Sequence, residues 1–83
     1  MNGLLPSDMI DQTDESTMCI AFGKRVRKLR KAKGWSQEKL AEFSGIHRNY
    51  VSDMERGERN VSLKIIERLA KALDVELSEL FLF

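Results

Sequence analysis

The side chains best suited to hydrogen bonding are concentrated in residues 45–60, GIHRNYVSDMERGERN. This stretch contains three arginines, two asparagines, the only tyrosine and the only histidine of the chain, arranged around the apolar residues Val51 and Met54. An arginine offers five N–H donors in one plane, and an asparagine offers both donors and an acceptor. Two interpretations fit this composition: the polar face of a solvated helix, or a surface that recognises a ligand through hydrogen bonds.

Catalytic and metal-binding chemistry has little support in the sequence. The chain has one cysteine, Cys19, and one histidine, His47, and its carboxylates are not clustered. One cysteine excludes both a disulfide framework and a thiolate zinc site within one chain. No nucleophile with a partner base can be assigned. We therefore expect a protein that is not an enzyme, with no metal, no cofactor and no small-molecule ligand.

Charge is distributed unevenly along the 83 residues. Residues 1–18 contain four acids and no base, whereas the rest of the chain contains all 14 Lys and Arg against nine acids, a formal charge of +5. Residues 1–18 also show no sustained hydrophobic period, so we predict a disordered acidic arm there. Residues 19–83 then form a single domain, and its positive charge favours a polyanionic partner.

The sequence also bears on cellular location. No apolar run approaches the roughly 20 residues that a membrane span needs, and the N-terminus lacks the basic-then-apolar order of a signal peptide. A single cysteine suits a reducing compartment. We expect a cytoplasmic protein without a membrane partner.

From Ile20 onward the apolar residues recur with a helical period, as Phe22, Val26 and Leu29 do at i, i+4 and i+7. Polar N-caps and following glycines indicate where helices begin and end. The predicted helices cover residues 20–33, 36–44, 47–56 and 62–73, with a short fifth helix over about 78–83. No alternating strand pattern competes, so the predicted fold is all-α with five helices.

Apolar pairs support the three helix starts at Ser36, His47 and Ser62. In a hydrophobic staple, an apolar residue just before the N-cap packs against the residue four positions after the N-cap. Each start is flanked by such a pair: Trp35 and Leu40, Ile46 and Val51, Val61 and Ile66.

The second and third predicted helices have the spacing of a helix-turn-helix. Ala41 is small enough for two helices to cross closely, and Gly45 tolerates the positive φ that the turn needs. Leu40, Ile46, Val51 and Met54 supply apolar contacts at the crossing. Ser44 stands where this motif usually has an apolar residue, so we expect its hydroxyl to donate to the carbonyl of Leu40.

With these features the chain resembles the Cro and phage-repressor family of helix-turn-helix proteins over about residues 20–81. The resemblance rests on KLRKAKGWSQEKLAEFSGI, YVSDMERGERN, LAKALDV and the closing ELF. The ERGERN–SL passage is most similar to the controller proteins of restriction–modification systems. The resemblance implies a compact, lambda-repressor-like domain of five helices, whose third helix enters the major groove of double-stranded DNA.

The resemblance places Arg48, Asn49 and Tyr50 where family members touch bases. Arginine can form two hydrogen bonds with guanine, and asparagine two with adenine, each good pair giving about 1–3 kcal/mol of discrimination. The ring of Tyr50 can pack on a thymine methyl group, or its hydroxyl can reach a phosphate. In the other interpretation, all three residues are simply the solvated face of a surface helix.

Contacts to the DNA backbone are expected from polar residues on and beside the two helices. These residues are Ser36, Gln37, His47, Ser52, Arg56, Arg59 and Asn60. Ser36 serves equally well as a plain N-cap, and Arg59 and Asn60 serve equally well to shape the loop before the fourth helix. His47 is an unusual N-cap, and a phosphate or base that faces its imidazole would explain its presence and make binding pH-dependent.

Two further pairs have roles within the protein. Arg30 and Glu55 match positions that the resembled family uses for an ion pair between the first and third helices, and we assign them to structure.

The C-terminal LSELFLF has more consecutive apolar residues than one helix can turn inward. A two-fold homodimer would cover the remainder, and Ile65 and Leu82 are the predicted centre of its interface.

The resulting prediction is a dimeric, sequence-specific transcriptional regulator of the Cro/C1 type, a repressor or controller protein that binds an inverted-repeat operator on the nucleoid. Two alternatives remain open. One is the antitoxin of a toxin–antitoxin pair, and the other is a helical protein-interaction module that does not bind DNA.

Overall fold

The computed structural model describes residues 16–83, and all elements in this part of the chain are helical. The predicted arm over residues 1–18 falls mostly outside these residues. Helix α2 begins at Thr17, with the Ser16 hydroxyl accepting from the backbone N–H of Cys19 at 3.3 Å. Residues 16–18 therefore belong to the first described helix and its cap, although they had been assigned to the arm.

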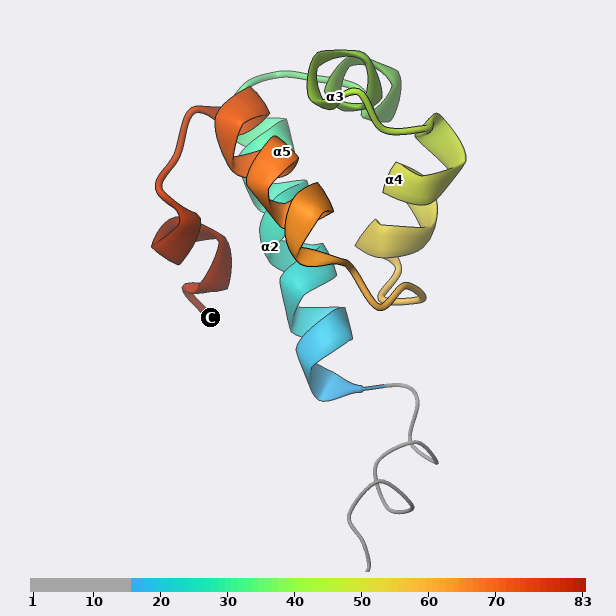
Figure 1. Ribbon diagram of the computed structural model, residues 1–83, viewed down its shortest axis with the longest axis vertical. Helices are drawn as coiled ribbons and strands as arrows, with labels where there is room; N and C mark the ends of the chain where they lie inside the picture. The colour runs from blue at the N-terminus through green and yellow to red at the C-terminus, as the bar shows by residue number, and fades with distance from the viewer. Residues whose placement is uncertain (1–15) are drawn as a thin grey trace, which may run out of the picture.

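Four α-helices and one 3₁₀ helix follow one another in the described residues (Figure 1). They are α2 Thr17–Ala32, α3 Gln37–Ser44, α4 Arg48–Glu55, α5 Leu63–Leu73 and η1 Leu77–Phe81. The prediction of an all-α fold is confirmed.

The prediction of five α-helices is wrong, because the last element is a 3₁₀ helix. It has only five residues, and no side chain caps its N-terminus at Glu76. Such a short segment cannot recover the cost of nucleating an α-helix. It is held in place by Leu80, which is fully buried, and by Arg25 of α2, whose Nε donates to the carbonyl of Glu79 at 2.7 Å.

All three predicted N-caps are present. The side chains of Ser36, His47 and Ser62 each accept a backbone N–H from the first turn of α3, α4 and α5 respectively. The six residues of the predicted staples all contribute to the core: Leu40, Ile46 and Val51 are buried in it, and Trp35, Val61 and Ile66 pack against it. Local sequence therefore fixes where these helices begin.

One core unites the helices, and its members are buried apolar side chains from every element. They are Phe22, Val26, Leu40, Ala41, Ile46, Val51, Met54, Leu69, Ala70, Leu73 and Leu80. Helix α2 contacts α4 and η1, and α3 contacts α4 and α5. Helices α2 and α4 approach closely at Gly23, where a Cβ atom would lie 2.2 Å from the carbonyl oxygen of Met54.

Candidate nucleic-acid interface

Helices α3 and α4 are joined by a short turn whose geometry is set by glycine. Gly45 has φ 71°, which a residue with a side chain rarely adopts. The N–H groups of Gly45 and of Ile46 both donate to the carbonyl of Ala41. Ser44 donates its hydroxyl to the carbonyl of Leu40 at 2.6 Å, as predicted, which satisfies a polar side chain in the core.

A buried ion pair connects α2 to α4, the second helix of the motif. Arg30 Nε lies 2.7 Å from Glu55 Oε2, and its Nη2 donates to Oε1 at 2.9 Å. The two side chains are only 8% and 3% exposed. A third guanidinium nitrogen, Nη1, donates to the carbonyl of Trp35 at 2.7 Å. The expected pair of Arg30 and Glu55 is therefore present, and it orients α4 relative to α2.

Gln37 joins this network from the N-terminus of α3. Its Nε2 donates to Glu55 Oε1 at 3.0 Å, and the side chain is half-buried. Gln37 had been assigned only to a phosphate contact. Its amide instead has one hydrogen bond inside the protein and keeps a carbonyl oxygen and a second N–H for other partners.

The N-terminal end of α4 presents its polar side chains outward. His47, Arg48 and Asn49 are all exposed, and we refer to these three residues as the recognition edge. His47 caps the helix: its Nδ1 accepts from the backbone N–H of Asn49 at 3.0 Å. The cap explains why this histidine lies at the start of α4, and a contact of its imidazole with a phosphate or base stays a prediction. Its Nδ1 is occupied, and Nε2 is the nitrogen that can meet a ligand.

Arg48 makes an ion pair that the sequence did not predict. Its Nε lies 2.9 Å from Oε2 of Glu38, on the first turn of α3, and the two side chains are 52% and 64% exposed. The contact crosses from one helix of the motif to the other. It places a carboxylate directly beside the arginine that is predicted to touch a base.

Tyr50 is half-buried and packs against the core, unlike the recognition edge. The guanidinium of Arg59 lies over its ring, 4.5 Å from the centroid. Arg59 Nη2 also lies 3.4 Å from Asp53 Oδ2. Together these contacts hold Arg59 against α4 and cover one face of the tyrosine ring.

Arg56 lies at the other end of α4 among acidic and hydroxyl groups. It donates to Ser52 Oγ at 2.7 Å and to the carboxylates of Asp53 and Glu58. Glu58, more than Asp53, raises the pKa of Arg56 above its ordinary value, so its guanidinium stays charged. The Arg56 side chain is 53% exposed, so it could exchange these carboxylates for a phosphate.

Several of the predicted backbone-contacting residues meet at one small depression. It has a volume of about 160 Å³ and is lined by Arg27, Arg30, Gln37, Ser52, Glu55 and Arg56. We refer to it as the polar hollow. Of its three arginines, Arg30 is paired with Glu55 and Arg56 with Asp53 and Glu58, whereas Arg27 forms no ion pair among residues 16–83. Arg27 therefore supplies the positive charge that could attract an anion to this hollow.

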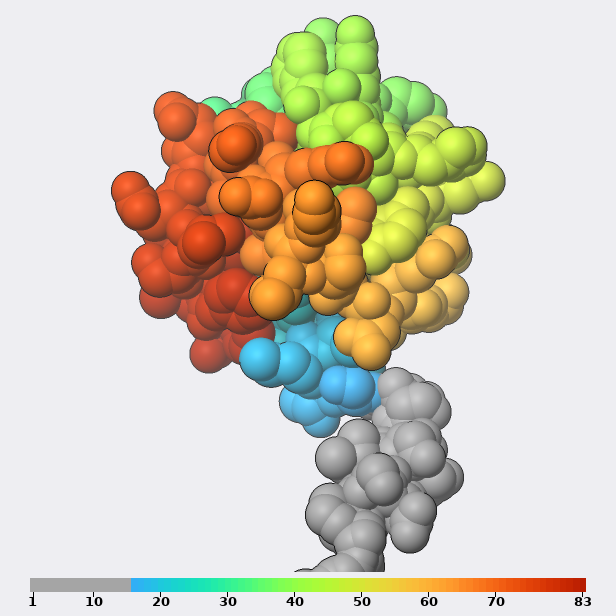
Figure 2. All heavy atoms as spheres, in the orientation of Figure 1, coloured from blue at the N-terminus to red at the C-terminus, as the bar shows by residue number. Residues whose placement is uncertain are grey.

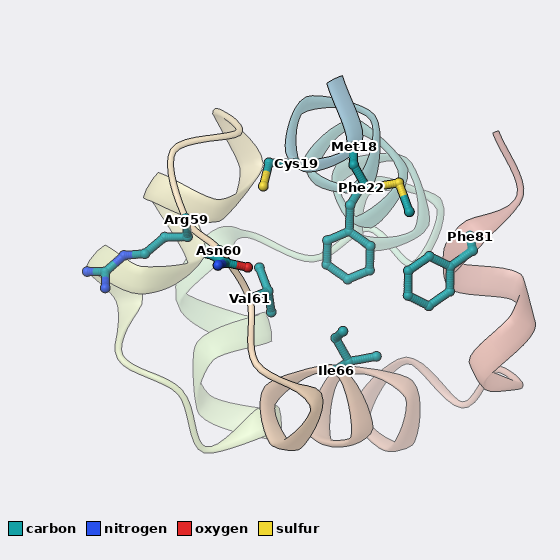
Figure 3. Close-up of a pocket in the computed structure, with 8 residues that line it drawn as sticks. All are labelled: Met18, Cys19, Phe22, Arg59, Asn60, Val61, Ile66 and Phe81. Carbon is teal, nitrogen blue, oxygen red and sulfur yellow. The ribbon is translucent and has the colours of Figure 1, made fainter. Parts of the chain in front are cut away.

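Asn60 is separated from this group. It lines a different depression, the apolar hollow, together with Met18, Cys19, Phe22, Arg59, Val61, Ile66 and Phe81. Figure 3 shows Phe22 and Phe81 facing the inside of this hollow, while the side chain of Arg59 extends away from it. Asn60 and its neighbour Arg59 therefore do not line the polar hollow, whereas Gln37, Ser52 and Arg56 do.

Sequence reasoning missed two residues at this surface, Arg27 and Glu38. Arg27 lies three residues before Arg30 and therefore on the same side of α2, a spacing that could have identified it among the basic residues of that helix. Glu38 had been assigned only to the helix dipole. Its contact with Arg48 depends on how α3 and α4 cross, which no local pattern reveals.

The predicted dimer residues lie outside the helix-turn-helix, Ile65 on α5 and Leu82 just after η1. Ile65 is half-buried against the core, and Leu82 is 61% exposed just after η1. In the view of Figure 1, η1 and α4 occupy opposite sides of the molecule. Within residues 16–83 there is no helix long and apolar enough to cross a membrane, and there is no cluster of three metal-ligating side chains.

Two short helices crossing over a glycine turn, the second with an exposed polar N-terminal edge, define a helix-turn-helix protein. The model of the family described as helix-turn-helix matches residues 26–80. The chain is 51% identical over 65 residues to the control protein C.BamHI of Bacillus amyloliquefaciens, covering 77% of this chain and 80% of that protein. The chain belongs to the helix-turn-helix family.

Solved structures agree with this assignment. The restriction–modification controller protein C.AhdI from Aeromonas hydrophila superposes with a TM-score of 0.75 at 59% identity, covering 76% of this chain and 96% of that chain. The hypothetical transcription factor NHTF from Neisseria superposes with a TM-score of 0.76 at 38% identity, covering 99% of this chain and 86% of that chain. The similarity to restriction–modification controller proteins thus extends from sequence to structure.

Proposed function

We propose that this protein is a dimeric regulator of transcription that binds double-stranded DNA in a sequence-specific manner. The observation that carries the proposal is the recognition edge: three exposed polar side chains at the N-terminus of α4, on a helix fixed from behind by the buried pair of Arg30 and Glu55. A helix of this kind fits the major groove, whose base edges offer a distinct pattern of donors and acceptors.

Arg48 and Asn49 are the proposed base-contacting residues. Both are exposed at the start of α4, the end that enters the groove in proteins of this architecture. Tyr50 has a smaller proposed part in base recognition, because its ring is half-buried beneath Arg59. Its hydroxyl edge is the part that can reach DNA.

The polar hollow is the proposed site for a backbone phosphate. Gln37 lies there at the first position of α3, where the positive end of the helix dipole favours an anion. Ser52 and Arg56 contribute from α4, and Arg27 from α2. Phosphate contacts of this kind fix the position of the protein on the duplex, whereas base contacts determine its sequence preference.

Dimerisation is proposed through the apolar surface of α5 and the C-terminal residues. Leu63, Leu77, Leu82 and Phe83 are all more than half exposed, and Leu63 reaches 83%. In Figure 2, α5 occupies the middle of the visible face, between the C-terminal residues and the ends of α3 and α4. A two-fold pairing would bury these side chains and give an isologous interface.

Such a dimer would carry two copies of α4. If they lie about 34 Å apart, they enter successive major grooves of an inverted repeat, about 10 base pairs from centre to centre. A protein bound in this way on the nucleoid blocks RNA polymerase where the operator overlaps a promoter, and can recruit it where the operator lies upstream.

Binding-site selection from a pool of random duplexes tests the proposal. We expect enrichment of a palindrome with half-sites about one helical turn apart. Affinity for the enriched duplex should fall steeply between about 50 and 200 mM salt, because several phosphates are neutralised. If no sequence is enriched and affinity is insensitive to salt, the protein is an interaction module and the proposal fails.

A further inference from the structure

The ion pair between Glu38 and Arg48 lies at the centre of the proposed recognition surface. The two residues come from different helices of the motif, with Arg48 Nε 2.9 Å from Glu38 Oε2. Both side chains are more than half exposed, so the pair adds little to folding stability. Its consequence is instead for what Arg48 can bind.

We propose that Glu38 is a specificity-determining residue: by neutralising Arg48, it prevents this arginine from binding phosphates while leaving it able to recognise guanine. This inference rests on the proposed function, because it concerns how the same surface distinguishes one DNA sequence from another.

The physical basis is the difference between the two kinds of DNA contact. Attraction to phosphates depends on net charge, is independent of sequence, and strengthens with each phosphate that is neutralised. Recognition of a base edge depends on the directions of hydrogen bonds to neutral groups. A carboxylate beside Arg48 cancels the attraction of this arginine to phosphates. It leaves recognition of a base edge possible, because the N–H groups of the guanidinium remain after its charge is balanced.

The atoms in contact suit this division. Glu38 approaches Nε, which carries one of the five N–H groups of the guanidinium. The other four are on the two terminal nitrogens, and two of them suffice for the paired contact with guanine. Arg48 can therefore form that contact without leaving Glu38, whereas a strong phosphate contact would bring a second anion beside the carboxylate.

Glu42 provides a matched control. It lies one turn further along α3, is exposed, and forms no ion pair within residues 16–83. Glu38→Gln and Glu42→Gln remove the same charge from the same helix, so any difference between them reports the contact with Arg48. Nearby Arg56 and Arg59 are paired with Asp53 and Glu58 and are unaffected by either change.

The experiment measures binding of both variants to a random-sequence duplex and to the duplex that the wild-type protein selects. On the random duplex we expect Glu38→Gln to bind about fivefold more tightly than Glu42→Gln near 50 mM salt. The slope of log affinity against log salt should be steeper by about 0.9, the value for one added phosphate contact. On the selected duplex the affinities of the two variants should agree within about twofold. The ratio of affinity for the selected duplex to affinity for the random duplex therefore falls for Glu38→Gln alone.

A variant background and a spectroscopic measurement complete the test. With Arg48→Ala present, Glu38→Gln and Glu42→Gln should bind the random duplex equally. In the DNA-free protein, the side-chain Nε–H resonance of Arg48 should shift in Glu38→Gln and stay in place in Glu42→Gln.

The inference is overturned if the two variants bind the random duplex equally. It is also overturned if Glu38→Gln weakens binding to the selected duplex and leaves the random duplex unchanged, since Glu38 would then only orient Arg48. Failure of the proposed function gives a different result, in which the wild-type protein selects no duplex. The comparison on random DNA still reports on Glu38 in that case.

Discussion

Helices α4 and α5 both bury an apolar face in the same core, yet their outer surfaces differ. The exposed side of α4 carries the recognition edge, and one of its buried residues, Glu55, is charged. Helix α5 buries only Leu69, Ala70 and Leu73, and exposes Leu63. The polar surface is therefore supported by a buried network of charged hydrogen bonds, whereas the apolar surface is supported mainly by burial, with one hydrogen bond from Arg25 to the carbonyl of Glu79.

This difference suits two kinds of partner. Base recognition requires donors held in position, and the network of Arg30, Glu55 and Gln37 joins α4 to both α2 and α3. An apolar contact is not directional, so α5 and the C-terminal residues can pair with a second copy without a buried polar network. The following predictions separate the two surfaces, beginning with the largest effect.

Glu55→Ala should destabilise the fold most. It leaves the buried guanidinium of Arg30 without its carboxylate, and we expect the free energy of unfolding to fall by about 3–5 kcal/mol. Urea denaturation followed by circular dichroism measures this loss. The double variant Arg30→Met with Glu55→Leu should recover a large part of it, because no buried charge remains unpaired. Equal losses in the single and double variants would mean that packing, and not charge, matters here.

Arg48→Ala should alter recognition and leave the fold intact. We expect a loss of about 1–3 kcal/mol of discrimination at one base pair of each half-site. Competition between the selected duplex and duplexes with single substitutions would locate that base pair. A change in thermal stability with an unaltered sequence preference would contradict the role assigned to Arg48.

Leu82→Asp tests the apolar surface. It places a charge where we propose that two copies meet, so self-association should weaken at least about tenfold, or about 1.4 kcal/mol. Sedimentation equilibrium measures the association constant. Ser78→Asp is a suitable control, because it adds the same charge on the exposed side of η1 without removing apolar area. Equal effects of the two variants would place the interface elsewhere.

His47→Ala should cost about 1 kcal/mol of stability through loss of the N-cap of α4. His47→Asn keeps a side-chain acceptor at that position and should restore most of the loss, as thermal denaturation would show. If His47→Asn is as stable as the wild type but binds every duplex more weakly, the exposed Nε2 of the imidazole contacts a phosphate. If His47→Ala is as stable as the wild type, the cap contributes nothing to stability.

The sequence predicted those features that depend on neighbouring residues. The caps at Ser36, His47 and Ser62, the glycine turn at Gly45 and the back-bond of Ser44 all involve residues within five positions of one another. The pair of Arg30 and Glu55 was predicted from family resemblance, since the two residues are 25 positions apart.

The features that were missed depend on how elements pack. The contact of Glu38 with Arg48 depends on how α3 and α4 cross. The contact of Arg59 with Tyr50 depends on the path of the chain after α4 ends. The 3₁₀ form of η1 is set by the positions of Leu80 and Arg25 in the folded chain. Helical periodicity in LSELFLF could not distinguish it from an α-helix, because a segment this short contains little more than one turn of either kind.

Gln37 has two roles on the polar side of the molecule, since its amide donates to Glu55 and also lines the polar hollow. Gln37→Ala should change the free energy of unfolding by less than about 1 kcal/mol, because Arg30 still pairs with Glu55. Binding to the selected duplex and to a random duplex should weaken alike, by about threefold or 0.7 kcal/mol, since a phosphate contact carries no sequence information. Filter binding to both duplexes measures this ratio. Gln37→Glu is the sharper variant, because a carboxylate there repels both Glu55 and the phosphate and should weaken binding further. If Gln37→Ala weakened binding to the selected duplex alone, Gln37 would contact a base. It would then belong with the residues that determine sequence preference and not with those that contact phosphates.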